Sequence, residues 1–367
     1  MGKRLVIAGA GHAHMLVMAR LKEFVTAGHR VTVIAPCEYH YYSGMGPGML
    51  GGFYRPAELR FPIRRLTERL GGRFLLGEVA SIDPAGQTVH LTSQETTEYD
   101  LLSCNLGSQI KSDMVDGQAD DIYPVKPIEA LHEARCQILA AGQKRPLRIG
   151  VIGAGPSGVE IAGNLWRLGQ QPGMRPVTVT LYTASRLLTD FPVRVRRIAE
   201  ASLRQRKIEI RENCRIRAVG TGQLTDIDGE NTSFDILFLA TGLTPSRVFA
   251  DSAIATGTDG GMLVNQFLQS TQYPEIFGGG DCISFQPEPL AKVGVYAVRQ
   301  NPVLCHNLMA TLEQRPLRPF VPGGSYLTIL NLGDGTGLLH KWSLTWHGRL
   351  AFRVKDAIDR RFVRTFR

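Results

Sequence analysis

The chain has 367 residues, of which 43% are hydrophobic and 20% charged, so it is long enough for two domains and apolar enough for globular cores. Its formal net charge of +9 suits an anionic partner, such as a nucleic acid, an anionic membrane or an anionic cofactor. Because the sequence contains no zinc finger, recognition helix or aromatic RNA-binding motif, we expect no nucleic-acid partner.

The six cysteines form neither a CxxC nor a CxxxxC spacing. We therefore expect no metal site and no redox-active dithiol close in sequence, although folding could still bring two cysteines together. The sequence shows no signal peptide and no apolar run of the ~18 residues that span a bilayer. These features predict a cytoplasmic protein, or one that lies peripherally on the inner face of a membrane.

The N-terminal segment carries a first glycine motif. An apolar strand at 5–10 contains Gly9 and leads to Gly11, and a helix is expected over His14–Thr26. This arrangement is typical of a dinucleotide site, but His14 replaces the third glycine, and the second strand (Arg30–Ala35) ends without the usual acid. His12 and His14 could hydrogen-bond a phosphate, or they are simply polar residues at the start of a helix.

Residues 38–54 are rich in glycine and tyrosine, with Pro47 in the middle. A loop of this composition could lie against a flat ring system, because exposed aromatic side chains are costly. The alternative is an ordinary surface loop. The pattern then predicts a helix over 60–70, a hairpin from 73–83 and 87–92, and a buried strand over 99–107.

A second and fuller glycine motif lies in Arg148–Leu165, between an apolar strand and a helix. Gly153 is expected to make the tight turn, Gly155 to let a pyrophosphate approach the backbone, and Gly158 to let the helix pack on the strand. The helix amides and dipole would then receive the phosphates. Two dinucleotide sites in one chain suggest two cofactors that exchange electrons.

The order of the remaining elements indicates nesting. A linker over 113–127 and a second nucleotide unit follow the first, and the chain then returns with a Gly-Asp element at 271–281. The sequence thus predicts an α/β protein with two nested Rossmann-like domains, one from 1–110 with 262–322 and one from 111–261, and a C-terminal region at 323–367. The other elements expected are helices at 128–141, 194–206, within 288–307 and at 350–367, and strands at 177–182, 208–212, 215–219, 234–242, 262–270, 326–331 and 338–344.

These motifs occur in the order found in flavoproteins with two dinucleotide-binding domains. The chain resembles the pyridine nucleotide–disulfide oxidoreductase superfamily, and residues 151–165 (VIGAGPSGVEIAGNL) are most similar to type II NADH dehydrogenases. The stretches YYSGMGPG and IDRRF also resemble an oxidoreductase module that is sometimes fused to selenide, water dikinase.

The resemblance implies FAD in the first site and NADH or NADPH in the second. Asp281 would bind the ribityl chain, Val79 would contact adenine through its backbone, and Lys292–Gly294 would open a helix toward the flavin pyrimidine, where reduced flavin gathers negative charge. Glu160 would lie near the nicotinamide, unless it is an acid that simply favours the first helical turns. The implied FAD residues are Gly9, Gly11, His12, Ala13, His14, Pro47, Val79, Gly107, Gly280, Asp281, Lys292, Val293 and Gly294. The implied nicotinamide-site residues are Gly153, Gly155, Pro156, Ser157, Gly158, Glu160, Thr183, Arg186 and Gly242. Glu160 and Lys292 would be the catalytic residues.

Three positions depart from the family pattern. The dithiol pair after the second strand is absent and Cys37 stands there alone, which argues against a disulfide reductase. Thr183 stands where an acid is usual, so either NADPH is tolerated, with Arg186 attracting its 2′-phosphate, or nicotinamide binding is weak. Cys104 is expected to be a buried strand thiol, and Cys282 a small apolar filler rather than a flavin contact.

The tail at 350–367 has an amphipathic helical pattern, with Val354, Ile358, Phe362 and Phe366 spaced by four. From Arg349 to the end there are seven basic and two acidic residues. Such a helix docks on an anionic membrane, or it packs on its own protein or on the second subunit of a homodimer.

We therefore expect an FAD-dependent oxidoreductase that passes hydride from NAD(P)H to flavin and on to a quinone-like acceptor. One alternative is a sulfide- or selenium-linked flavoprotein, which needs reactive cysteines beside the flavin. Another is a flavin-stabilised binding module with little turnover.

Overall fold

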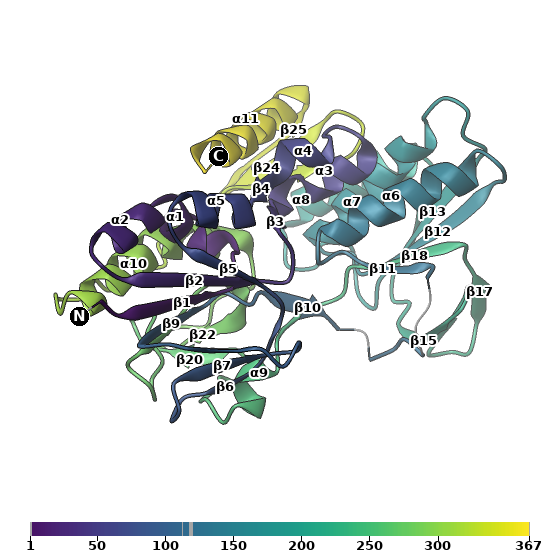
Figure 1. Cartoon of the computed structure of the whole chain (residues 1–367). Helices are drawn as coiled ribbons and strands as arrows, with labels where there is room; N and C mark the ends of the chain where they lie inside the picture. Colours follow the sequence, from purple (N-terminus) through teal and green to yellow (C-terminus); the bar gives the residue numbers. More distant parts are fainter. Residues whose placement is uncertain (1, 112, 117–119, 367) are drawn as a thin grey trace.

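The computed structural model describes residues 2–111, 113–116 and 120–366. The first domain is built on a parallel five-stranded sheet in the order β21-β9-β1-β2-β5. Its last strand in sequence, β21, lies at the edge beside β9, so the chain completes this sheet only after the second domain is finished (Figure 1). The strands are β1 (Arg4–Ala8), β2 (Arg30–Ala35), β5 (Arg73–Leu76), β9 (Leu101–Cys104) and β21 (Ile276–Gly278).

The second domain repeats this plan with a parallel sheet in the order β11-β18-β12-β13-β14. The predicted α/β fold with two nested Rossmann-like sheets is therefore confirmed. The chain crosses between the two sheets at β10 and β19, which pair antiparallel, while the predicted boundaries at 111 and 262 stay predictions. The elements are β10 (Ser108–Ile110), β11 (Ile122–Pro124), α6 (Glu129–Gly142), β12 (Leu147–Ile152), α7 (Pro156–Gly169), β13 (Val177–Tyr182), α8 (Val193–Gln205), β14 (Glu209–Arg211), β18 (Ile236–Leu239) and β19 (Leu243–Pro245).

Helices that start beside β1 and after β22 cover the first sheet. The predicted helix over 14–26 is broken at Arg20 into two short helices, and α10 packs against them. Buried Asn301 joins the two layers, since its Oδ1 accepts the N–H of Leu16 (2.8 Å). The helices are η1 (His12–His14), α1 (Met15–Ala19), α2 (Leu21–Thr26), α5 (Ile63–Arg69) and α10 (Gly294–Leu312).

Residues 38–54 are more ordered than a surface loop. They form β3, η2 and α3, and α3 is buried against α7 and α6 of the second domain. The glycines permit this contact: a Cβ on Gly51 would lie 2.3 Å from Asn164 Oδ1, and one on Gly48 would lie 2.5 Å from the Tyr54 ring. The elements are β3 (Tyr39–Tyr41), η2 (Ser43–Met45), α3 (Gly46–Gly51), α4 (Pro56–Leu59) and β4 (Arg60–Pro62).

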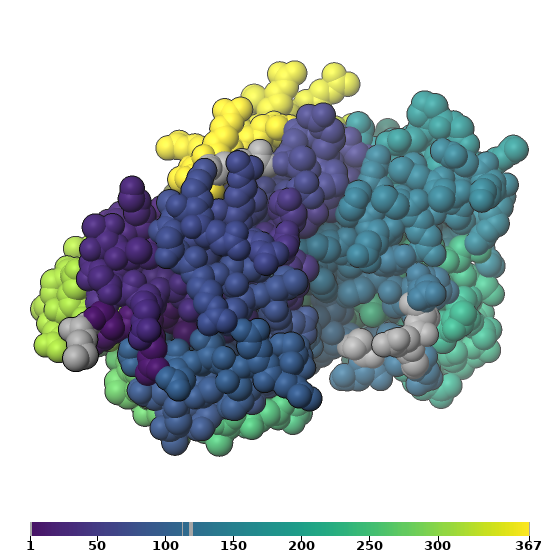
Figure 2. Space-filling model, in the orientation of Figure 1, coloured from purple at the N-terminus to yellow at the C-terminus, as the bar shows by residue number. Residues whose placement is uncertain are grey.

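The C-terminal region is a three-stranded antiparallel sheet with α11 packed on it (Figure 2); its strands contact α7 and α8 of the second domain, and α11 contacts Tyr42 and Gly44 of the first. The third strand, β25, was not predicted. The elements are β23 (Thr328–Asn331), β24 (Gly337–Lys341), β25 (Leu344–Gly348) and α11 (Arg349–Thr365). The smaller elements elsewhere are β6 (Val79–Asp83), β7 (Thr88–Leu91), β8 (Thr96–Glu98), β15 (Ile216–Gly220), β16 (Gln223–Asp226), β17 (Asn231–Ser233), α9 (Val248–Asp251), β20 (Met262–Val264), η3 (Gly280–Cys282) and β22 (Ile283–Phe285). None of the described helices is long and apolar enough to span a bilayer.

Candidate functional site

The turn after β1 is shaped by glycine. Gly9 has a φ of +85°, and a Cβ there would lie 2.2 Å from the carbonyl oxygen of Asn105. Gly11 then caps η1 without a side-chain hydrogen bond, which leaves the first amides of this turn free. Ala13 lies buried within η1. This end of β1 can therefore receive an anionic group from the cofactor.

The two histidines of this turn have different surroundings. His14 is buried, and its ring nitrogens already contact Gly9 O (2.5 Å) and Ser103 Oγ (2.8 Å), so it fixes the turn rather than offering a nitrogen to phosphate. The ring of His12 lies 5.2 Å from the rings of His40 and Tyr42, and its Nε2 is buried without a hydrogen-bond partner. Burial, together with the charge of nearby Lys126, lowers the pKa of His12 to about 4.

Asp281 is held by two groups that the sequence reasoning missed. Its Oδ2 accepts hydrogen bonds from Ser108 Oγ (2.9 Å) and from Lys126 Nζ (2.7 Å). Both partners lie between the sheets in sequence, in segments that carry no recognisable motif. Gly280, with a φ of +78°, precedes Asp281 in η3, and its N–H donates to Gln300 Oε1 (2.7 Å). Asp281 thus lies at the junction of the two domains.

The N-terminus of α10 is open, but the lysine before it is not free. Lys292 Nζ pairs with Asp259 (2.7 Å) and donates to the Ile283 carbonyl, so its charge is already balanced inside the protein. Val293 caps α10 without a side-chain hydrogen bond, and the nearest atom to a Cβ on Gly294 would be Ser43 Oγ at 3.9 Å. The dipole of α10 therefore points into space that a flavin ring can use.

The other implied FAD residues lie apart from this turn. Pro47 is buried inside α3, and Val79 begins β6. Gly107 has a φ of +73°, and a Cβ there would meet nothing within 4 Å. Gly107 therefore borders open space between the sheets, whereas Pro47 is packed inside α3.

The second glycine motif forms a tighter cradle. A Cβ on Gly153 would lie 2.3 Å from the Ala240 carbonyl oxygen, and one on Gly158 would lie 1.7 Å from the Gly153 carbonyl oxygen. Gly155, by contrast, has nothing within 4 Å of a Cβ and caps α7 without a side-chain hydrogen bond. Pro156 and Ser157 follow it on the surface. The start of α7 is therefore an open anion site, as a pyrophosphate requires.

The end of β13 carries no carboxylate. Thr183 is buried, and its Oγ1 accepts the N–H of Ser185 (3.3 Å). Arg186 is exposed close to it in sequence, and a Cβ on Gly242 would meet only open space. Thr183 itself therefore offers no negative charge to repel a 2′-phosphate, although Glu212 lies in the same loop region, where its Oε1 accepts the N–H of Leu187 (2.7 Å).

Glu160 lies in a buried polar cluster that joins α7, α11 and the segment around Tyr42. Its Oε1 accepts the N–H of Asn331 (2.7 Å). Lys355 Nζ pairs with Asp359 (2.7 Å), and Tyr42 OH donates to the other oxygen of Asp359 (3.1 Å). Burial raises the pKa of Glu160 to about 7, although the Lys355 ammonium opposes this shift. The cluster therefore contains a carboxyl group that changes its charge near neutral pH.

The face of α11 that packs inward is not the apolar face seen in the sequence pattern. The predicted face of Val354, Ile358, Phe362 and Phe366 is partly exposed, and Ile358 is 48% exposed. The fully buried stripe is Ala351, Lys355, Asp359 and Val363. Phe362 still stacks on Tyr42, with ring centroids 4.7 Å apart. The predicted helix is confirmed, and an ion pair occupies the centre of the face that packs on the protein.

All six cysteines are free thiols. Cys104 and Cys282 are buried close together, since Cys282 Sγ lies 3.5 Å from the Cys104 carbonyl oxygen. Burial raises the pKa of Cys282 to about 11, so this thiol is not a nucleophile at neutral pH. Among the described residues, no group of three or more potential ligands could hold a metal ion.

Comparison with known proteins agrees with this geometry. Residues 3–307 match the family model of pyridine nucleotide-disulphide oxidoreductases. The chain is 24% identical to a type II NADH:quinone oxidoreductase of Staphylococcus epidermidis, covering 98% of this chain and 95% of the relative. It is also 24% identical to ferroptosis suppressor protein 1 of Taeniopygia guttata, covering 97% and 93%.

Solved structures show the same fold. NDH2 from Plasmodium falciparum in complex with NADH superposes with a TM-score of 0.84 at 14% identity, covering 99% of this chain and 96% of that one. The sulfide:quinone oxidoreductase of Aquifex aeolicus superposes with a TM-score of 0.80 at 20% identity, covering 100% and 92%. With the family match spanning most of its length, this chain belongs to the pyridine nucleotide-disulphide oxidoreductase family.

Proposed function

We propose that this protein is an FAD-dependent oxidoreductase that takes hydride from NADH or NADPH and passes electrons to a quinone-like acceptor. The observation that carries the proposal is that one chain presents two glycine-lined helix N-termini, neither of them capped by a side-chain hydrogen bond, on two nested parallel sheets. Relatives named as NADH:quinone and NAD(P)H-ubiquinone oxidoreductases, each about 24% identical, support the choice of donor and acceptor.

The first domain has the groups that FAD needs. The amides of η1 would hold the pyrophosphate, Asp281 would bind the ribityl chain, and the N-terminus of α10 would face the pyrimidine ring. When bound, FAD supplies the acceptance of hydride and the onward transfer of electrons. Ser108 and Lys126 orient the Asp281 carboxylate for this contact. Lys292 would act as a structural residue there rather than as a catalytic one, because Asp259 holds its charge.

The second domain would bind the nicotinamide cofactor. The open N-terminus of α7 at Gly155 would receive its pyrophosphate. Because Thr183 carries no charge and Arg186 is exposed nearby, the site would accept NADPH as well as NADH. Arg186 would provide the attraction for the 2′-phosphate.

Glu160 would donate or accept a proton while the acceptor is reduced. Reduction of a quinone-like acceptor by two electrons also takes up two protons. A half-buried carboxyl group with a pKa of about 7 exists in both protonation states at neutral pH, which suits a general acid or base. Lys355 and Asp359 would keep the charge around Glu160 balanced as its proton leaves and returns.

A sulfide-linked reaction is the second candidate, since the fold also matches a sulfide:quinone oxidoreductase. That reaction needs a reactive cysteine, and burial raises the pKa of Cys282 to about 11 and that of Cys104 well above its usual value. The thiols therefore favour a nicotinamide donor.

The C-terminal region would dock on an anionic membrane. Trp342, Leu344 and Trp346 are exposed on or beside β24 and β25, and Leu350 and Ile358 are exposed on α11. Apolar groups of this size on the surface mark interaction sites, and the arginines of α11 add attraction to anionic lipid headgroups.

The decisive experiment mixes the purified, flavin-loaded protein with NADH or NADPH without oxygen and follows the visible flavin absorbance. Rapid bleaching by both donors is the expected result, and Arg186→Gln should slow bleaching by NADPH selectively. Protein that keeps its flavin but stays oxidised with both donors would overturn the dehydrogenase proposal. Bleaching by sulfide alone would favour the second candidate, and no bleaching by any donor would favour a binding module.

A further inference from the structure

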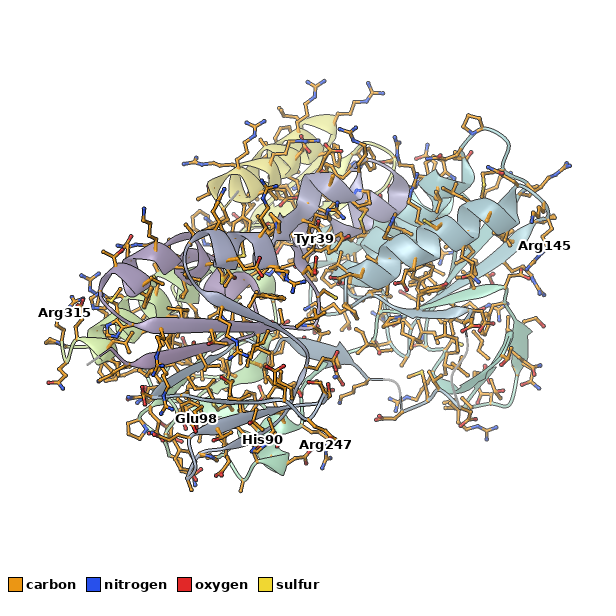
Figure 3. All side chains as sticks on the ribbon, viewed as in Figure 1. Tyr39, His90, Glu98, Arg145, Arg247 and Arg315 are labelled. Carbon is orange, nitrogen blue, oxygen red and sulfur yellow. The ribbon has the colours of Figure 1, made fainter. Side chains whose placement is uncertain are left out.

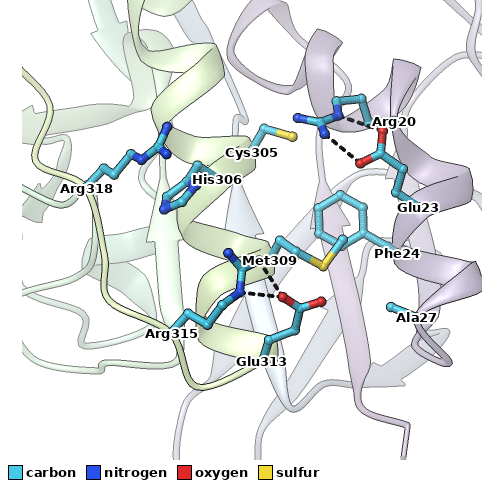
Figure 4. Close-up of a pocket in the computed structure, with 10 residues that line it drawn as sticks. All are labelled: Arg20, Glu23, Phe24, Ala27, Cys305, His306, Met309, Glu313, Arg315 and Arg318. Atoms are coloured by element: carbon cyan, nitrogen blue, oxygen red, sulfur yellow. Dashed lines mark hydrogen bonds and ion pairs between the residues drawn. The ribbon is translucent and has the colours of Figure 1, made fainter.

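A hollow of about 450 Å³ lies between α2 and the C-terminal half of α10 (Figure 4). Its floor is apolar, because Phe24 and Cys305 are buried and Met309 lies beside them. Arg20 and Glu23 form one wall, and the segment after α10 forms the other. The ten lining residues are Arg20, Glu23, Phe24, Ala27, Cys305, His306, Met309, Glu313, Arg315 and Arg318.

Three arginine guanidinium groups line this hollow, and only two of them are paired with a glutamate. Arg20 pairs with Glu23 (2.7 Å), and Arg315 donates to Glu313 (2.6 Å). Among the described residues, the guanidinium group of Arg318 has no hydrogen bond or ion pair. The three arginines and two glutamates therefore leave one positive charge that the protein does not balance.

The backbone of Arg318 is nevertheless held firmly. Buried Asn307 accepts the Arg318 N–H through Oδ1 (2.8 Å), and its Nδ2 donates to the Arg318 carbonyl (2.9 Å) and to the Phe267 carbonyl (2.8 Å). His306 lies on the same wall, and its pKa is lowered by burial and by the charge of Arg318. A neutral imidazole beside two guanidinium groups leaves room for an anion to supply the missing negative charge.

This hollow is separate from the proposed cofactor sites. It lies at the far end of α10 from Gly294, and a 19-residue helix is about 28 Å long. Figure 3 shows Arg315 at the outer end of the first domain, on the side away from Arg145 of the second domain. A dinucleotide bound at Gly11 or Gly155 therefore does not explain the basic wall.

We propose that this hollow binds a small organic anion, with its phosphate or carboxylate group on Arg318 and Arg315 and its apolar part on Phe24 and Met309. The volume lies within the range of small-molecule pockets, and the guanidinium fork matches the oxygens of either anionic group. The apolar floor selects an anion that carries a ring or chain over a bare inorganic ion.

The test measures binding by calorimetry on the flavin-loaded protein, with phenyl phosphate, benzoate, inorganic phosphate and phenol as probes. At least one of the two aromatic anions should bind at least tenfold more tightly than inorganic phosphate and phenol, and its affinity relative to the other distinguishes a phosphate from a carboxylate ligand. Arg318→Gln should weaken that probe tenfold or more, because it removes a cation without breaking a contact in the protein. Arg197→Gln, an exposed arginine on α8, is the matched control and should leave binding unchanged.

Two further outcomes bear on the proposal. Met309→Ser should weaken the aromatic anion severalfold and leave the affinity for inorganic phosphate unchanged, since only the ring contacts the floor. Equal binding by the Arg318→Gln and Arg197→Gln variants would overturn the proposal, as would equal affinity for the aromatic anions and inorganic phosphate. If each variant unfolds at the same temperature as the wild type, a loss of binding is not caused by a loss of fold.

Discussion

Burial gives Glu160 a proton affinity that exposed carboxylates lack. In the folded protein its pKa is about 7, compared with 4.5 for an ordinary glutamate, so folding takes up a proton between these values. The stability that this protonation provides is present below pH 4.5 and is lost as the pH rises to about 7. The chemistry of Glu160 thus depends on its surroundings in the fold, which its place in the glycine motif does not reveal.

Replacement of Glu160 by glutamine removes the pH dependence of stability that this side chain causes. Glutamine stays neutral and still accepts the Asn331 N–H, so we expect Glu160→Gln to gain stability over the wild type between pH 5 and pH 8, on the order of 1–3 kcal/mol. Urea unfolding at the two pH values measures this difference. The control is exposed Glu288→Gln, and an equal difference between variant and wild type at both pH values would contradict the shifted pKa.

Three histidines, of which His14 is buried and His12 and His40 are half-buried, change stability with pH in the opposite direction. Burial lowers the pKa of His12 and His14 to about 4 and that of His40 to about 3, so all three stay neutral in the fold while the unfolded chain binds protons below about pH 6.5. The stability that they provide is present above pH 6.5 and is lost as the pH falls toward 4. We expect a steep loss of stability on acidification, with up to three protons bound on unfolding.

A single ring replacement tests this expectation. His40 stacks on Phe61, with centroids 6.3 Å apart, so His40→Phe keeps the ring and removes one titrating group. The slope of unfolding free energy against pH, measured from pH 6 to pH 4.5, should fall by an amount that corresponds to about one proton. His90→Phe at a half-exposed site is the control, and an unchanged slope in His40→Phe would show that His40 does not titrate on unfolding.

At the scale of elements, α11 shows what sequence pattern can and cannot predict. The period of four correctly predicted a helix and an apolar face of Val354, Ile358 and Phe362, but it gave no sign that Lys355 and Asp359 are buried on the face beside it. A charged residue is buried only when its partner is present, and Tyr42 and Gly44 come from a distant segment. The glycine motifs of β1 and β12 were predictable because local turns determine them.

The same limit explains the residues that were missed in the site. Lys126 and Ser108 contact Asp281 only because the chain crosses between the sheets at this point. The 38–54 segment was expected to be a loop, because its glycines resemble turn residues, yet they serve the close contact of α3 with α7. Long-range packing, and not local pattern, decided these positions.

The buried ion pair in α11 supports a prediction about this element. Lys355→Met leaves Asp359 without its cationic partner and with only the Tyr42 hydroxyl, so we expect a loss of about 3 kcal/mol in stability and earlier hydrogen exchange in α11. The double variant Lys355→Met/Asp359→Leu removes both charges and should recover most of this loss. Additive losses in the two single variants would show that the pair does not act as a unit.

At the scale of the whole molecule, the C-terminal sheet and α11 join the two domains. A Cβ on Gly163 of α7 would lie 2.1 Å from the Leu332 carbonyl oxygen, and Lys355 donates to the Gly44 carbonyl of the first domain. The inner side of this region therefore completes the polar cluster around Glu160. On its outer side, Trp342 is 71% exposed and Leu344 is 60% exposed.

This outer side predicts binding to anionic vesicles. A buried tryptophan or leucine side chain contributes about 2 kcal/mol, so Trp342→Ser/Trp346→Ser should lower partitioning into phosphatidylglycerol vesicles at least tenfold in a sedimentation assay. Val321→Ser, which removes an apolar side chain that is 75% exposed elsewhere, should change nothing. Higher salt should weaken binding because the arginines of α11 contribute electrostatic attraction. If the double variant partitions like the wild type, this surface is not the membrane contact. If instead the wild type sediments as a dimer and the double variant as a monomer, a second copy of this chain is the partner that covers these tryptophans.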